Sequence, residues 1–293
     1  MYQIKSSDNY TKEICRTSFV LFVKELKKIL FILLLFIPSK AIAASDSDCF
    51  KSANLGTIGQ FGTKCYDMLI VNRDMLLAAI KSENFYIEKD GIKYYFGRDN
   101  FNRKLIFTGQ ITNFRSLFLK KADFNEDIGY WNTERAKNMS SMFYGATSFN
   151  QDISNWKTSK VTNMASMFRD ATSFNQDISS WETSKVTNMS QMFRNARAFQ
   201  QDIGGWDVRK VKNMTRMFEN ATAFDGNIGN WKTGSVINMS YMFFNAKSFN
   251  ENLSNWETGS VTNMSSMFRN AVIFDQDIGG WDVRKVKNMT RMF

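Results

Sequence analysis

The chain contains no histidine, one proline and three cysteines among its 293 residues. Without histidine it has no Ser-His-Asp or Cys-His arrangement and no His-ligated zinc site. The sequence also has no phosphate-binding loop and no nucleophile placed beside a base. We therefore expect a protein that is not an enzyme, with no catalytic residue, no cofactor and no metal site.

Long runs of basic charge are also lacking. The net charge is +10, but no Lys/Arg run in the second half of the chain exceeds two residues. Nucleic-acid-binding proteins cluster these residues on one stripe, so we expect no nucleic-acid partner. A solvated basic surface is the favoured interpretation, and weak attraction to acidic polymers or membranes is the alternative.

The first 43 residues have the features of a secretion signal. Basic residues within 24–28 precede the apolar run 29–37, a proline follows, and residues 41–43 have the A-x-A form of a cleavage site. The run is much shorter than the roughly 20 residues that cross a bilayer. We predict a signal peptide over 1–43 and no membrane span in the mature chain. An uncleaved membrane anchor is the alternative.

Export would place the remaining chain in an oxidising compartment, where disulfides persist. Cys15 lies within the predicted signal, which leaves Cys49 and Cys65 as the remaining pair. We predict a disulfide between Cys49 and Cys65, and two buried free thiols are the alternative.

Residues 44–110 lack any repeat and are typical of a small α+β domain. The segment 74–80 begins with the N-cap residue Asp74 and continues with helix formers. Within 85–96, Asp-Gly separates two aromatic and β-branched runs, which predicts a hairpin, and 105–107 predicts a further strand. Because the end of a repeat array exposes its core, we expect this domain to be an N-terminal cap.

The remaining sequence follows a 25-residue period. All seven tryptophans, from Trp131 to Trp281, are spaced 25 residues apart. The aligned units begin at Ile111 and give seven complete repeats and a partial eighth over 111–293. A period of this size is typical of units that bury their apolar faces only against their neighbours.

The first half of each unit has helical periodicity. In the unit 161–185 its apolar residues are Met164, Met167, Phe168 and Ala171. Their i, i+3, i+4, i+7 spacing predicts one face of a short helix, with Thr162 or Asn163 as its N-cap.

In the second half of the unit, Phe174, Ile178 and Trp181 lie among polar residues, which predicts a short strand and a turn. We therefore predict an α/β fold. It is a right-handed, leucine-rich-repeat-like solenoid with a parallel sheet of short strands and one short helix per 25-residue turn.

The columns that recur in nearly every unit of the repeat are predicted to be structural. In the unit 161–185 they are Asn163, Met164, Met167, Phe168, Phe174, Asp177, Ile178 and Trp181. A methionine-rich binding groove is the alternative for the Met columns. Calcium shared between stacked carboxylates is the alternative for the Asp177 column. Asn227 and Asn252 replace the acid in that column, which favours a hydrogen-bonding role.

The variable columns are where binding is expected. The candidate binding residues are Tyr144, Arg169, Arg194, Tyr241, Phe244 and Arg269. Exposed aromatic residues can anchor an interface, although tolerated surface residues would give the same pattern.

The string N-M-S-x-M-F-x-x-A-x-x-F-N-Q-D-I-S-x-W-x-T-S-x-V resembles the repeat of BspA-type leucine-rich-repeat surface proteins, also found in mycoplasma and other bacterial surface proteins. The resemblance covers 111–293, with Phe, Met and Ile in place of most leucines. It implies a secreted or cell-surface protein that binds proteins of a host or a neighbouring cell in adhesion. A structural, self-associating surface component is the alternative.

Overall fold

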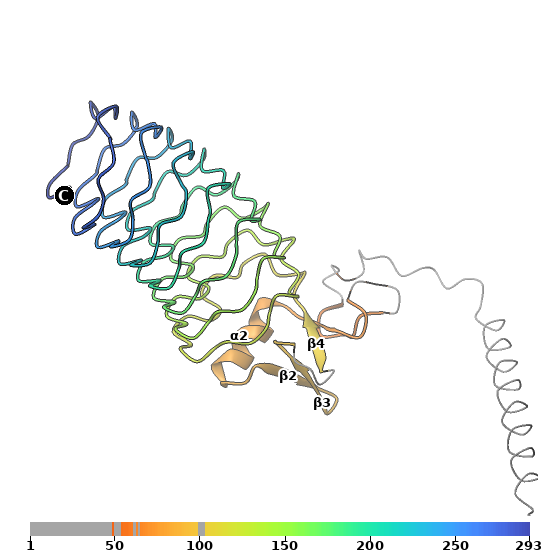
Figure 1. Cartoon of the computed structure of the whole chain (residues 1–293). Helices are drawn as coiled ribbons and strands as arrows, with labels where there is room; N and C mark the ends of the chain where they lie inside the picture. The colour runs from red at the N-terminus through yellow and green to blue at the C-terminus, as the bar shows by residue number, and fades with distance from the viewer. Residues whose placement is uncertain (1–48, 50–53, 61–62, 64, 99–102) are drawn as a thin grey trace, which may run out of the picture. The chain divides into compact units, whose positions relative to one another are not determined.

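The computed structural model describes residues 49, 54–60, 63, 65–98 and 103–293 (Figure 1). The predicted signal peptide, with Cys15, lies outside the described residues. The chain divides into two compact units, 1–44 and 45–293, and all described residues belong to the second. Within the described residues, no helix has both the length and the apolar character needed to cross a membrane.

The described residues before the repeats form one α-helix and a four-stranded sheet. The elements are β1 (Leu69–Ile70), α2 (Arg73–Lys81), β2 (Tyr86–Lys89), β3 (Ile92–Tyr95) and β4 (Lys104–Phe107). The sheet order is β1-β4-β3-β2, with β2 and β3 antiparallel and the other pairs parallel. Asp90 (φ 52°) and Gly91 (φ 76°) form the hairpin turn, because the favoured two-residue turn needs positive φ at both positions.

The helix begins earlier than the sequence predicts. Asn72, not Asp74, is the N-cap, and its side chain accepts a hydrogen bond of 3.0 Å from the Met75 N–H. Leu76 and Ile80 on α2 are buried in the same core as the repeats.

From Ile111 onward, each 25-residue unit forms one turn of a stack, which we call a rung (Figure 1). Rung 1 is 111–135, and the following rungs begin at every twenty-fifth residue through rung 7, 261–285. Successive rungs are joined by single parallel bridges between the asparagines of one column, from Asn113 to Asn288.

The backbone of the rungs differs from the predicted helix and strand. Residues 165–170 form consecutive turns, and 174–181 contain no strand. Ser166 (φ 57°) and Asp170 (φ 59°) have left-handed backbone conformations, which a right-handed helix excludes. The apolar pattern therefore identifies the side chains that face the core, but the backbone N–H groups do not form the hydrogen bonds of a helix.

Every second N–H in this segment points to the next rung. In rung 3, residues 164, 166, 168 and 170 donate to the carbonyls of residues 188, 190, 192 and 194 at 2.8–3.1 Å. The intervening N–H groups close turns within the rung, as from Met167 to the Met164 carbonyl at 3.2 Å. The same four donor columns recur from rung 1 onward, so these peptide dipoles share one direction along the stack.

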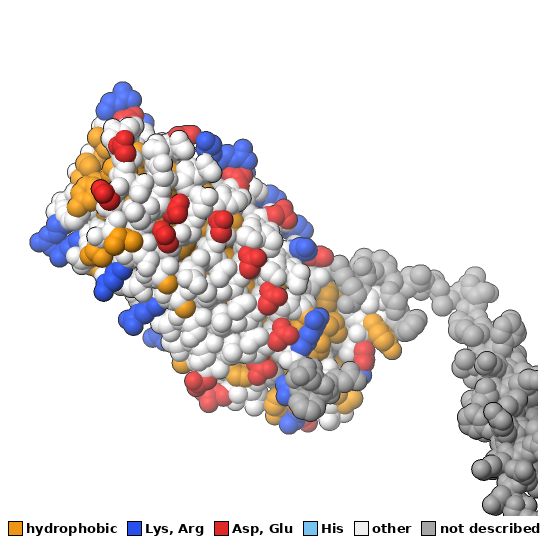
Figure 2. All heavy atoms as spheres, in the orientation of Figure 1, with side chains coloured by type: hydrophobic (Ala, Val, Ile, Leu, Met, Phe, Trp, Pro, Cys, Tyr) orange, Lys and Arg blue, Asp and Glu red, His pale blue; other side chains and the backbone are white. Residues whose placement is uncertain are grey.

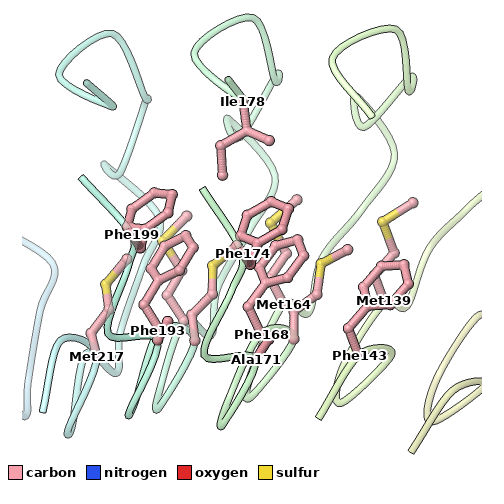
Figure 3. Close-up of a cluster of buried hydrophobic side chains, with 14 of the residues drawn as sticks. Met139, Phe143, Met164, Phe168, Ala171, Phe174, Ile178, Phe193, Phe199 and Met217 are labelled. Atoms are coloured by element: carbon pink, nitrogen blue, oxygen red, sulfur yellow. The ribbon is translucent and has the colours of Figure 1, made fainter. Parts of the chain in front are cut away.

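The core consists of stacked columns of like side chains (Figure 3). Phe168 and Phe174 have ring centroids 3.9 Å apart, and Phe168 lies 5.7 Å from Phe193 of the next rung. Met164 and Met167 are fully buried between the rungs and are therefore core residues of the stack.

The segment 54–110 covers the first rung and replaces a missing neighbour. In later rungs the tryptophan Nε1 donates to a carbonyl of the preceding rung, as from Trp156 to Ile128 at 3.2 Å. For Trp131 the acceptor is Phe96, at 2.9 Å. The Phe85 ring also packs edge-on against Phe124 at 5.1 Å. These contacts make the segment a cap for the stack.

A disulfide joins Cys49 to Cys65, the two cysteines paired from the sequence. Both are buried with Ile70 and Phe107, in a small cluster beside the main core. The disulfide therefore ties the first described residue to the sheet of the cap.

Candidate functional site

Two neighbouring columns on each rung carry residues that vary between rungs. One is the column of Arg169, and the other lies three residues earlier, at Ser166. All rungs have positive φ in the second column, including Gln191, Arg216 and Tyr241. Because backbone hydrogen bonds between successive rungs fix the backbone there, the side chain at this column can change without changing the fold.

The centre of this region is a buried carboxylate between two arginines. The Glu219 side chain is 6% exposed, and its Oε2 lies 3.1 Å from Arg194 Nε and 2.8 Å from Arg216 Nη1. A buried carboxylate requires such partners, since an unpaired charge in the interior is costly. The two arginines are thereby held in fixed positions on neighbouring columns.

The contacts continue toward the cap. Arg194 and Arg169 both donate to Gln191 Oε1, at 3.5 and 2.9 Å from their Nη1 atoms. The Arg169 guanidinium lies over the Tyr144 ring, 4.6 Å from its centroid. Stacking of this kind fixes a planar cation on an aromatic face.

The contacts also continue away from the cap, into an aromatic pair. The Arg216 guanidinium lies 4.2 Å from the Tyr241 centroid, and the Tyr241 and Phe244 rings are 5.9 Å apart. Arg269 lies 5.8 Å from the Phe244 ring. A continuous row of contacts thus runs from rung 2 to rung 7.

We call this row the Arg–aromatic strip. It comprises Tyr144, Arg169, Gln191, Arg194, Arg216, Glu219, Tyr241, Phe244 and Arg269. All six candidate binding residues lie in it. Gln191 and Arg216 are not among the residues predicted from the sequence, and the signal that identifies them is the Ser, Gln, Arg, Tyr variation of the second column.

The acidic column forms local turns. The Asp177 carboxylate accepts a hydrogen bond from the Ser179 N–H at 2.8 Å, which lowers the pKa of Asp177 from its ordinary value. Asn252 accepts the same bond from Ser254 at 2.9 Å, so the column needs an acceptor oxygen and not a charge. Among the described residues, no group of three or more Cys, Asp or Glu side chains is arranged to hold a metal ion.

The asparagine column makes the same kind of turn. Asn163 Oδ1 accepts from the Ala165 N–H at 2.9 Å, and the Asn163 backbone forms the bridge to the neighbouring rungs. These contacts give the asparagine side chains of this column a structural role beside the backbone bridges between rungs.

A hollow of 540 Å³ lies where the cap meets rungs 1 and 2. Its lining includes Arg98, Asp127, Tyr130 and Asp152. The Tyr130 hydroxyl donates to the Phe96 carbonyl at 2.9 Å, and burial raises the pKa of Tyr130. The Arg98 guanidinium covers the Tyr130 ring at 4.9 Å. These residues attach the cap to the stack.

The stack and its strip define a repeat protein. Residues 93–205 and 187–293 both match a family described as "Mycoplasma protein of unknown function, DUF285". Because these two matches cover more than half of the sequence, the chain belongs to this family. No curated protein and no solved structure matches the chain.

Proposed function

We propose that this chain is a secreted or surface-displayed bacterial protein that binds other proteins in adhesion to a host or a neighbouring cell. In this proposal the stack is a right-handed, leucine-rich-repeat-like solenoid of the BspA type. Membership of a mycoplasma repeat family supports the bacterial origin and the repeat architecture in this proposal. The disulfide between Cys49 and Cys65 supports an extracellular location, because disulfides persist in oxidising compartments.

The observation that carries the proposal is the Tyr241–Phe244 pair within the Arg–aromatic strip. Both rings are partly exposed, and both have an arginine stacked against them. Tyrosine and arginine are enriched among the residues that dominate binding energy at protein interfaces. Their geometry is set before a partner arrives, so little side-chain entropy remains to be lost on binding. The proposal includes no catalysis and no cofactor.

Self-association into a structural surface layer is the second candidate. Residues 201–218 and 276–293 are identical, QDIGGWDVRKVKNMTRMF, so one chain presents the same surface twice. Two copies of one surface on a chain suit an array of identical subunits.

The test is binding of the purified chain to immobilised extracellular-matrix proteins and to whole cells. The variant Tyr241→Ser/Phe244→Arg gives rung 6 the residues that rung 7 has at the same two columns, Ser266 and Arg269. We therefore expect the fold to tolerate it. The control Lys232→Glu introduces the residue that Glu257 supplies at the same column, away from the strip. We expect saturable binding by the wild type and the control, and at least a roughly tenfold weaker binding by the strip variant.

Equal binding by all three proteins would exclude the strip as the interface. Concentration-dependent filaments of the purified chain, with no saturable partner, would favour the structural candidate instead.

A further inference from the structure

Stacking gathers basic residues that are 25 positions apart in the sequence. Over rungs 1 to 4, the turn that follows each tryptophan carries exposed cations at its tip or just beyond it. They are Arg135, Lys137, Lys160, Lys185, Lys210 and Lys212. We call this set the basic edge. The sequence does not show this set as one basic segment, because each rung contributes only one lysine or arginine to each column.

The turns that carry these residues are held in register. The Val186 N–H donates to the Thr183 carbonyl at 2.8 Å and closes the turn around Lys185. The Thr183 hydroxyl then donates to the Asp207 carbonyl of the next rung at 3.0 Å. The tryptophans that precede these turns, Trp181 and Trp206, have parallel rings with centroids 6.5 Å apart. The lysines of this column therefore form a row with one charge per rung.

Like charges in neighbouring positions repel one another, so an anion bound along such a row lowers its electrostatic energy. Within the part of the chain that the structure describes, Lys160, Lys185 and Lys210 take part in no ion pair. The Lys210 charge helps to lower the pKa of the Asp207 carboxylate in the same turn, and that carboxylate is paired with Arg209. In rungs 5 and 6 the same column holds Ser235 and Ser260, so the fold does not need the charge. On the face seen in Figure 2, lysine and arginine side chains lie mainly along the margins of the stack.

We propose that the basic edge binds a linear acidic polysaccharide lying along the stack, with its sulfate or carboxylate groups on successive lysines. Pairing with a polymer of regular charge releases condensed counterions from the polymer and relieves the repulsion within the row. The hydroxyls of Ser159 and Ser184, next to the lysines, match the hydroxyl groups of a sugar chain. This inference concerns a different surface and a different partner from the proposed function.

Two observations favour a polysaccharide over nucleic acid. The turns 158–162, 183–187 and 208–212 contain no aromatic residue, and binding of single strands depends on stacking bases against aromatic rings. The disulfide in the cap indicates an oxidising compartment, where extracellular polysaccharides are found.

The test measures binding of the purified chain to heparin and to polygalacturonate over a range of salt concentrations. The variant Lys160→Ser/Lys185→Ser/Lys210→Ser copies Ser235 and Ser260 into the basic edge. The control Lys81→Ser/Arg197→Thr/Lys247→Thr removes three exposed cations elsewhere, two of them from the column that holds Thr172 and Thr222. Thermal melting of each variant checks that it is folded.

We expect the edge variant to bind at least one polysaccharide roughly tenfold or more weakly at low salt, with a shallower salt dependence, while the control stays close to wild type. The reverse change, Ser235→Lys/Ser260→Lys, extends the row and is expected to tighten binding. The proposal is overturned if wild type binds neither polysaccharide, or if edge variant and control bind equally. Equal affinity for double-stranded DNA or polyglutamate, lost in the same variant, overturns the assignment to polysaccharide.

Discussion

The Arg73 guanidinium donates from Nη1 to the Asn113 carbonyl at 3.0 Å, across the junction between α2 and rung 1. In every later rung the same carbonyl accepts from an N–H of the preceding rung, as Asn138 accepts from Phe114 at 2.8 Å. Arg73 therefore supplies the donor that a rung would supply. It also places a positive charge at the carbonyl end of the aligned peptides, as a cation does at the C-terminus of a helix.

Replacement of Arg73 by methionine removes this donor and leaves a carbonyl without its partner. We expect Arg73→Met to lower the free energy of unfolding by about 1 kcal/mol, which shifts the melting temperature by about 2–4 °C in a chain of this size. Circular dichroism during heating measures the shift. Lys81→Ser on the same helix is the control, and identical melting of both variants would contradict the assigned role.

The disulfide is expected to stabilise the cap. Cys49 and Cys65 are 16 residues apart, and closing a loop of this length contributes about 3 kcal/mol in the chain-entropy account. We expect Cys49→Ser/Cys65→Ser to lower the urea midpoint of the cap, and a reductant to lower that of the wild type equally. A wild-type midpoint that is insensitive to reductant would show that the bond contributes nothing.

The acidic column predicts a defined pH dependence. Hydrogen bonding from Ser179 lowers the pKa of Asp177 in the folded chain, so its carboxylate contributes stability above the unfolded pKa of about 3.9. That contribution disappears as the pH falls through the lower folded pKa. We expect Asp177→Asn to match the wild type at pH 7, because Asn252 makes the same bond.

Below pH 4 the same variant is expected to lose less stability than the wild type. Urea midpoints at several pH values measure the difference, and parallel curves would exclude Asp177 as a contributor. Melting in calcium and in chelator tests the alternative of shared calcium for this column. We expect no difference between those two conditions.

Phe193 lies at the middle of the aromatic stack. Its ring is 3.9 Å from Phe199 and 5.7 Å from both Phe168 and Phe218. We expect Phe193→Ala to destabilise the chain by about 3–5 kcal/mol, because the cavity cannot be filled by neighbours that are fixed in register. Phe244→Ala on the strip is the control and is expected to cost far less. Calorimetry distinguishes the two, and similar losses would contradict the assignment of Phe193 to the core.

The sequence predicts the rungs and the cap because apolar periodicity and turn residues report burial directly. Met164, Met167 and Phe168 are buried as their columns indicate. The helix predicted from the same residues is absent, because Ser166 and Asp170 adopt positive φ and their N–H groups bond to the next rung. Spacing within one unit shows which side chains face inward, but it does not show that a neighbouring rung will accept the backbone hydrogen bonds.

The candidate surfaces are hidden from the sequence for a related reason. Lys160 and Lys185 are 25 positions apart in the chain but lie one rung apart in the stack. Arg216 is likewise far in sequence from Arg194, although both contact Glu219. Reading down the columns of the aligned repeat recovers both groupings, whereas reading along the chain recovers neither.

The shared direction of the peptide ladder has a consequence for how such chains change over evolutionary time. Every interface between rungs offers the same four donors to the same four acceptors. Loss of residues 211–235, for example, would bring rung 4 against rung 6 with matching partners throughout. Whole units can therefore be gained or lost by recombination without redesign of the cap, and the number of rungs becomes a trait that varies independently of the fold.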